Sequence, residues 1–337
     1  MMPSRILVIQ TAFLGDAILA TALLENLHQA FPDAQLDFLV RKGHEGLFTK
    51  HPFLNQVLVW DKKKDRYRGL WKLLLFIRKQ RYEHVITVQR FASTGFLTAF
   101  SGAKNRIGFD KNPLSFAFTA TATHDLESGL HETSRNHSLI EFLVQTPVLR
   151  PRLYPTPADF EKIKGFQQQP YICVAPASVW FTKQYPADKW AAWLRSVPDS
   201  VAIYILGSPD DKTLGEDILK KAHRTGRSEN LCGRLSFLES AALMKTAQMN
   251  FVNDSAPMHM ASALNAPVCA VYCSTIPDFG FGPLSENSRV LEITDSLPCR
   301  PCGLHGHRAC PEGHFRCAVE IKESQFLDVL RESLARE

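Results

Sequence analysis

The chain has 337 residues, of which 45% are hydrophobic and 22% charged, the composition of a globular protein long enough for two domains. A net charge of +5 is mild for a dedicated nucleic-acid binder, so we expect no nucleic-acid partner. We find no signal-peptide pattern, and no apolar stretch reaches membrane-spanning length. These features predict a cytoplasmic protein with reduced cysteines, whose membrane contact is at most peripheral.

Strand-like apolar runs alternate with helical patterns through the first half of the chain. This alternation indicates βαβ units and a parallel sheet. Four prolines between Pro147 and Pro157 disfavour a helix and a central strand, so we predict the interdomain linker there. The predicted elements are a strand at 5–10, a helix at 16–30, strands at 35–40 and 57–60, a helix at 66–80 and a strand at 84–89.

The alternation restarts after the prolines. We therefore predict an α/β protein with two Rossmann-like, doubly wound domains, residues 1–150 and 158–337, that face a cleft. Ligands of open α/β sheets bind outside the carboxyl ends of the strands, which directs attention to the loops after Gln10, Ala175, Leu206 and Asp254. The predicted elements of this half are strands at 171–175, 201–206, 249–254 and 267–273, and helices at 187–195, 210–223, from 255 and at 324–335.

The first of these loops runs from Gln10 to Asp16 and leads into a helix. It resembles a phosphate-binding turn, but it lacks both the G-x-G-x-x-G pattern and a P-loop lysine, which disfavours a nicotinamide or ATP site. Asp16 stands at the start of the helix, where aspartate commonly caps exposed backbone N–H groups. Taken alone, the residue favours this capping role.

The loop after the strand at 171–175 contains hydroxyl side chains, among them Ser178, and one lysine, Lys183. A lysine in this position can neutralise a diphosphate, although a single loop lysine is more often a solvated charge. Asp254 and Ser255 end a strand and open a short helix that carries His259. The free N–H groups and positive end of that helix form an anion site, and His259 lies one turn away from it.

Together these segments resemble the ADP-heptose:lipopolysaccharide heptosyltransferase family, and its second type in particular, over nearly the whole chain. The matching motifs occur in family-like order and spacing in both predicted domains. They are Leu14-Gly-Asp16, Lys183 with Tyr-Pro and Trp190, Asn253-Asp-Ser255 with Met258-His259, Ala263 to Pro267, Pro277-Asp-Phe279 before Pro283-Leu-Ser285, and, as weaker matches, Arg106 to Phe109 and His131 with Arg135.

The resemblance implies a GT-B fold, with the acceptor in the N-terminal domain, ADP-heptose in the C-terminal domain, and inversion at the anomeric carbon. Asp16 would be the general base, and Lys183 with the helix after Ser255 would stabilise departing ADP, so that no metal or cofactor is required. Relatives commonly have glycine after the Asp-Ser pair, whereas this chain has Ala256 and Pro257. The implied donor-binding residues are Ser178, Lys183, Asp254, Ser255, Ala256 and His259.

A basic run separates a strand from a helix in the first domain. Such runs are usually solvated. The acceptor implied by the resemblance is an anionic lipid A-core headgroup, which clustered basic residues beside the apolar helix around Trp71 would attract at the inner face of the cytoplasmic membrane. Both interpretations stay open. The residues concerned are Lys62, Lys63, Lys64, Arg66 and Arg68.

The segment 299–317 is rich in cysteine and histidine. A C-x-x-C pair followed by two more cysteines is plausible for structural zinc, with free thiols or a redox-labile pair as the alternatives, because the last spacing is not that of a standard zinc knuckle. The predicted ligands are Cys299, Cys302, Cys310 and Cys317, with His314 as a substitute for the last.

Two other functions compete with the transferase. A nucleotide-sugar epimerase of the UDP-N-acetylglucosamine kind shares two Rossmann-like domains, but it would not need the basic acceptor segment. A non-catalytic, metal-binding interaction protein could be built around the cysteine-rich segment on a degenerate transferase body. The joint presence of Asp16, Lys183 and His259 argues against this second alternative. Neither the acceptor position nor the base of the donor nucleotide follows from the sequence.

Overall fold

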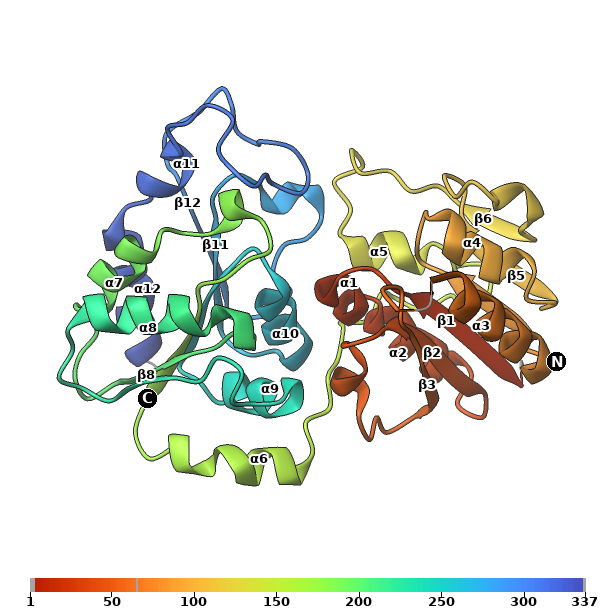
Figure 1. Ribbon diagram of the computed structural model, residues 1–337, viewed down its shortest axis with the longest axis horizontal. Helices are drawn as coiled ribbons and strands as arrows, with labels where there is room; N and C mark the ends of the chain where they lie inside the picture. The colour runs from red at the N-terminus through yellow and green to blue at the C-terminus, as the bar shows by residue number, and fades with distance from the viewer. Residues whose placement is uncertain (1–3, 65, 336–337) are drawn as a thin grey trace. The chain divides into compact units, whose positions relative to one another are not determined.

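The structure is a computed structural model that describes residues 4–64 and 66–335, with only the backbone of Arg66. The chain divides into two compact units, Met1–Tyr154 and Pro155–Glu337. Each unit contains a six-stranded parallel sheet with helices packed on it (Figure 1). In the described part of the chain, no helix is both long and apolar enough to cross a membrane.

The first sheet has the strand order β3-β2-β1-β4-β5-β6, and all neighbouring strands are parallel. The central strands are continuous apolar runs such as Ile6 to Ile9, which are buried because helices cover both faces of the sheet. The strands are β1 (Arg5–Gln10), β2 (Gln35–Arg41), β3 (Leu54–Trp60), β4 (His84–Thr87), β5 (Asn105–Phe109) and β6 (Ala120–Ala122).

The first unit contains the two predicted helical segments and two further helices, at 92–99 and 132–137, that were not predicted. The helix predicted at 16–30 consists of two helices that meet at Ala20, whereas the helix predicted at 66–80 is confirmed. The helices are α1 (Leu14–Leu19), α2 (Thr21–Ala30), α3 (Arg66–Gln80), α4 (Ala92–Ala99) and α5 (Glu132–His137), with short 3-10 turns η1 (Glu45–Phe48) and η2 (Ser115–Ala117).

The second sheet repeats the plan of the first, with the order β12-β11-β10-β7-β8-β9 and parallel neighbours. Its strands are β7 (Tyr171–Ala175), β8 (Ala202–Ile205), β9 (Ser228–Asn230), β10 (Met249–Asn253), β11 (Val268–Tyr272) and β12 (Ser288–Glu292). Its helices are α6 (Pro157–Ile163), α7 (Ala187–Leu194), α8 (Lys212–Ala222), α9 (Phe237–Lys245), α10 (Ala256–Leu264), α11 (Arg316–Val319) and α12 (Glu323–Leu334), with 3-10 turns η3 (Lys164–Phe166), η4 (Phe181–Lys183), η5 (Pro209–Asp211) and η6 (Pro277–Phe279).

Both sheets reverse their strand order at the same point. In the first unit the chain starts at β1, adds β2 and β3 on one side, and returns to add β4 on the other side. The second unit does the same with β7 and β10. The carboxyl ends of β1 with β4, and of β7 with β10, are therefore the topological switch points at which doubly wound sheets bind ligands.

The proline-containing segment predicted as a linker is largely attached to the first unit. The amide of Leu149 donates to Oδ1 of Asn26, and the Tyr154 hydroxyl donates to Glu25, both acceptors lying on α2. Beyond the unit boundary, Pro157 begins α6. A proline is tolerated there because the first helical residue needs no N–H partner.

Candidate active site

Asp16 lies in the first turn of α1, on the loop that follows β1. Its Oδ2 atom accepts a hydrogen bond of 3.1 Å from the backbone N–H of Phe13, and the residue is half-buried. This is the capping contact that the isolated residue favoured. It fixes the orientation of the carboxylate at the carboxyl end of the first sheet, next to the switch point.

Three loops meet at this edge of the first sheet. The backbone N–H and hydroxyl of Thr11, after β1, donate to Oε1 of Gln89, after β4, at 3.0 and 2.7 Å. The ammonium group of Lys62, after β3, donates to the carbonyl oxygen of Thr11 at 2.8 Å. The fold therefore brings a cationic side chain to the loop that carries Asp16.

The turn that follows Lys62 is organised by Asp61. Its Oδ1 atom accepts hydrogen bonds from the backbone N–H groups of Lys63 and Lys64, and its Oδ2 atom lies 2.8 Å from Nζ of Lys42. These contacts, with Lys42 foremost, lower the pKa of Asp61 to about 2. Lys63 and Lys64 are exposed, so their ammonium groups face water.

The residues of the predicted basic cluster differ in their exposure to solvent. Lys62 is half-buried and lies with its ammonium 4.9 Å from the centre of the Trp60 ring. Arg68 is exposed on α3, and the side chain of Arg66 is outside the part of the chain that the structure describes. Among the predicted acceptor residues, Lys62 reaches the Asp16 loop, through its hydrogen bond to Thr11.

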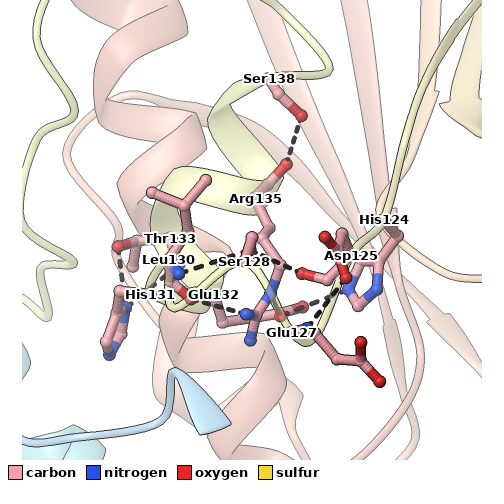
Figure 2. A network of polar contacts seen from close by, with 10 residues as sticks. All are labelled: His124, Asp125, Glu127, Ser128, Leu130, His131, Glu132, Thr133, Arg135 and Ser138. Atoms are coloured by element: carbon pink, nitrogen blue, oxygen red, sulfur yellow. Dashed lines mark hydrogen bonds and ion pairs between the residues drawn. The ribbon is translucent and has the colours of Figure 1, made fainter. Parts of the chain in front are cut away.

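The loop between β6 and α5 starts at the same edge of the sheet and is held by a buried ionic network (Figure 2). Oε2 of Glu132 accepts from Nε of Arg135 at 2.8 Å and lies 3.4 Å from Nε2 of His124. Arg135 also donates to the carbonyl oxygen of Leu130 at 2.6 Å. Burial acts to raise the pKa of Glu132, but the contacts with His124 and Arg135 together hold it below its usual value.

His131 is the N-cap residue of α5 and lies directly before Glu132, with its ring against Thr133 (Figure 2). Its Nδ1 atom accepts from the backbone N–H of Thr133 at 3.2 Å. In a neutral imidazole the proton then resides on Nε2, which makes that atom a hydrogen-bond donor. His131 and Arg135, the weaker sequence matches, lie in the first turn of α5, where the backbone N–H of Arg135 donates to the carbonyl oxygen of His131 at 3.0 Å.

In the second unit, Lys183 and Asp254 form an ion pair at the switch point. Lys183 follows β7, Asp254 follows β10, and Nζ of the lysine lies 2.6 Å from Oδ2 of the aspartate. The Thr275 hydroxyl, after β11, donates to the same oxygen at 2.6 Å. Two of the predicted donor-binding residues are therefore in contact, and the charge of the lysine is balanced by a buried carboxylate.

Asn253 holds the loop that carries the lysine. Its amide nitrogen donates to the carbonyl oxygen of Pro176 at 2.6 Å, and its Oδ1 accepts from the backbone N–H of Tyr185 at 3.1 Å. Within the loop, Gln184 donates to the carbonyl oxygen of Ser178 at 2.6 Å. The buried asparagine, which sequence analysis singled out only as part of a motif, thus ties both ends of this loop to β10.

The helix α10 begins beside this ion pair. Ser255 is its N-cap residue with an extended backbone, and Ala256 and Pro257 occupy the first turn. Pro257 fits there because the first turn leaves its N–H positions unbonded within the helix. His259 is buried on the same helix, one turn from its start. These predicted donor residues gather at one helix terminus, whose positive end favours an anion.

The cysteine-rich segment packs against the Lys183 loop, a contact that sequence patterns did not reveal. The backbone N–H of His307 donates to the Thr182 hydroxyl at 2.7 Å, and the backbone N–H of Thr182 donates to the carbonyl oxygen of His307 at 3.1 Å. Gly306 has a φ of +77°, and a Cβ atom there would lie 3.1 Å from Cγ of Lys183. The segment therefore helps to set the position of the lysine.

No disulfide joins the cysteines of this segment. Sγ of Cys299 lies 4.0 Å from Nε2 of His314, and Sγ of Cys310 accepts from the backbone N–H of Phe315. Over residues 4–64 and 66–335, no three His, Cys, Asp or Glu side chains converge closely enough to hold a metal ion. The four-ligand zinc site stays a prediction.

Metal analysis tests the zinc prediction. Protein purified without chelator should contain about one equivalent of zinc, and chelation should lower the melting temperature more than initial turnover, because a site with four protein ligands is structural. The experiment follows zinc content, melting and initial rates on the same sample. The site would be ruled out if the protein contains no zinc, its four thiols react with a thiol reagent, and chelation leaves its melting temperature unchanged.

The sequence model of glycosyltransferase family 9 (heptosyltransferase) matches residues 70–310, well over half of the chain. The chain belongs to glycosyltransferase family 9. The Escherichia coli protein lipopolysaccharide heptosyltransferase 2 is 22% identical to it, and the similarity spans 99% of each chain. The resemblance inferred from the motifs is therefore confirmed at the level of the family.

Solved structures of similar proteins support the fold of this family member. The structure of Escherichia coli ADP-heptose lipopolysaccharide heptosyltransferase II superimposes with a TM-score of 0.80 and 21% identity, over 98% of this chain and 99% of the other. The family 9 glycosyltransferase of Veillonella parvula gives a TM-score of 0.86 and 20% identity, over 99% and 98% of the two chains. The predicted GT-B fold class is confirmed.

Proposed function

We propose that this glycosyltransferase moves heptose from ADP-heptose onto the inner core of lipopolysaccharide, with inversion at the anomeric carbon. The observation that carries the proposal is the similarity to lipopolysaccharide heptosyltransferase 2 over the full length of both chains. It is supported by the positions of Asp16 and Lys183, because each follows the first strand of its sheet and lies at a switch point.

Asp16 is the proposed general base. An acceptor hydroxyl attacks the anomeric carbon of the donor, a new C–O bond forms, the bond to the ADP oxygen breaks, and the hydroxyl proton passes to the carboxylate of Asp16. The hydrogen bond from the Phe13 N–H fixes the orientation of this carboxylate. Because the N–H group is a donor, it does not compete with Asp16 for the acceptor proton. In this proposal the transfer requires no metal or cofactor.

Lys183 is the proposed partner of the departing diphosphate. Charge develops on the leaving oxygen, and a positioned ammonium group stabilises it most effectively in a site shielded from water. Asp254 holds the lysine in one place, and the N-terminus of α10, with Ser255 and Ala256, adds backbone N–H groups. Ser178 and His259 complete the proposed donor site, the first on the lysine's loop and the second on α10.

The proposed acceptor is the phosphorylated headgroup of lipid A-core, bound by the first unit. The Lys62 ammonium next to the Asp16 loop supports this proposal, and so does the exposed basic run that continues through Lys63, Lys64 and Arg68. Phosphate groups would be attracted to such a surface. The enzyme would then work peripherally on the inner face of the cytoplasmic membrane.

A ligand and product panel tests the proposed function. ADP and ADP-heptose should raise the melting temperature, because a ligand of the native state stabilises it by mass action, whereas UDP, GDP and their sugars should not. ADP-heptose should be consumed when acceptor is added, with heptosylated acceptor as the product. A UDP preference with an acceptor-independent change in the sugar nucleotide would favour the epimerase and overturn the proposal.

The basic run supplies a separate prediction. Replacing Lys62, Lys63, Lys64 and Arg66 with Gln should raise KM for the lipid acceptor and spare KM for the donor, and added salt should weaken the wild-type acceptor kinetics in the same way. The matched control removes as much charge from the second unit. It replaces Lys162, Lys189, Lys212 and Lys220, all exposed, with Gln. Equal acceptor KM in both variants would mean that the run is merely solvated.

A further inference from the structure

We infer that the outward face of α3 docks the first unit onto an anionic lipid bilayer. The inference rests on the proposed function, which requires a lipid-anchored acceptor, and adds the surface by which the enzyme reaches it. This α3 face is defined by Tyr67, Trp71 and Leu75 on the helix and by Phe100 at the end of α4. Figure 1 shows α3 alongside α4 on the outside of the first sheet.

The α3 face is apolar and open to solvent. Tyr67, Trp71 and Leu75 are 71%, 58% and 63% exposed. Their spacing of four residues places them along one side of the helix, while Leu74 and Ile77, on the neighbouring side, pack into the core of the first unit. Large apolar side chains at this exposure, three in a row, form a surface that usually contacts another molecule or a membrane.

The face continues from α3 onto α4. The Trp71 ring meets the ring of Phe96 edge-on, with centroids 5.5 Å apart, and Phe96 contacts Phe100 at 5.1 Å. Phe100 is 48% exposed, and the guanidinium of Arg78 donates to its carbonyl oxygen at 2.9 Å. Ring packing and this hydrogen bond hold the two helices together, so the face can insert as a preformed surface.

The charge around the α3 face selects an anionic partner. Nine basic residues and one acidic residue lie between Lys62 and Arg81, a local charge of +8, although the whole chain carries only +5. The rest of the chain is therefore net negative. Arg68, Lys72 and Lys79 are exposed on α3 next to the apolar stripe. Their long side chains can extend toward phosphate groups while the aromatic rings enter the interface.

These features fit a bilayer better than a protein partner. Tyrosine and tryptophan favour the boundary between water and hydrocarbon, and juxtaposed basic residues are attracted to anionic lipids over about a Debye length. A helix of 15 residues, about 22 Å long, can lie in the interfacial plane along its whole length. No acidic residue occurs on α3 to oppose such contact.

The α3 face is also connected to the candidate acceptor site. The helix starts just after the turn that holds Lys62, at the carboxyl end of the first sheet. Lys62 contacts Thr11 on the loop that leads to Asp16. A bilayer that lies against α3 would therefore present lipid headgroups at the end of the sheet where the proposed base is found.

Vesicle binding tests the inference without reference to catalysis. The full-length protein is mixed with vesicles of phosphatidylcholine alone or with added phosphatidylglycerol, and sedimentation is measured at low and high salt. Wild-type protein should bind the anionic vesicles, with a blue shift of tryptophan emission from Trp71. The double variant Trp71→Gln, Leu75→Gln should lose roughly tenfold or more of this affinity.

The control variant is Phe142→Gln, which removes a comparably exposed apolar side chain elsewhere in the first unit. It should bind vesicles like the wild type. The double variant should keep wild-type rates on a delipidated core acceptor and lose rate on vesicle-embedded acceptor. If no heptose transfer occurs at all, the proposed function is wrong. The vesicle-binding assay still tests the α3 face, because it does not depend on catalysis.

Two results would overturn the inference. The first is that the wild-type protein does not bind anionic vesicles, or that the double variant binds them with the same affinity as the wild type. The other is self-association through the same residues, seen as a dimer that the double variant loses in sedimentation velocity, with no vesicle binding by either protein. The second result would assign the α3 face to another copy of the chain.

Discussion

Replacing Asp16 with Asn should lower heptose transfer by about two orders of magnitude or more while ADP-heptose binding stays nearly intact. The amide has the shape of the carboxylate, and its oxygen can still accept from the Phe13 N–H, so the start of α1 should persist. What disappears is the ability to take the acceptor proton. The measurements are kcat with saturating substrates and ADP-heptose affinity by calorimetry.

Asp159 provides the matched control for this experiment. It occupies the same position in the first turn of α6, where Oδ2 accepts from the backbone N–H of Thr156 at 2.7 Å. Asp159→Asn therefore removes a capping charge at a site with no proposed chemistry, and should leave kcat unchanged. A parallel loss of ADP-heptose affinity and stability in Asp16→Asn would show that Asp16 is structural.

The elements that the sequence predicted best are those with a strong local signal. The strands β1 and β7 are short apolar runs buried on both faces, and α3 has a helical periodicity over 15 residues. The edge strand β9, Ser228–Asn230, was missed because three half-buried polar residues carry no such pattern. The helix α6 was missed because its proline was taken as a breaker, although Thr156 and Asp159 form a capping pair that could have revealed it.

The candidate site was predictable as a set of loops but not as a set of contacts. Strand ends placed Asp16, Lys183 and Asp254 at the carboxyl edges of their sheets, as parallel topology requires. The ion pair between Lys183 and Asp254 joins segments far apart in sequence, and local patterns carry no information about such pairs. The same is true of Gly306, whose closeness to the lysine depends on how the cysteine-rich segment folds back.

Replacing Lys183 with Ala should weaken ADP binding by about tenfold or more and lower turnover as well, because it removes a charge-assisted contact to the diphosphate. It should also lower the melting temperature, since the buried Asp254 carboxylate loses its cation and keeps the hydrogen bond from the Thr275 hydroxyl. ADP calorimetry and thermal melting measure the two effects. Lys189→Ala, at an exposed position on α7, is the control.

A double variant separates these two effects. Adding Asp254→Asn to Lys183→Ala removes the unpaired buried charge, and the amide can still accept from Thr275. The melting temperature should therefore recover toward the wild-type value. ADP affinity should stay low, because the cation that meets the diphosphate is still missing. If the double variant recovers both melting temperature and ADP affinity, then Asp254 repels ADP and Lys183 only neutralises the charge of Asp254. If Lys183→Ala alone leaves ADP affinity unchanged, the lysine is not part of the donor site.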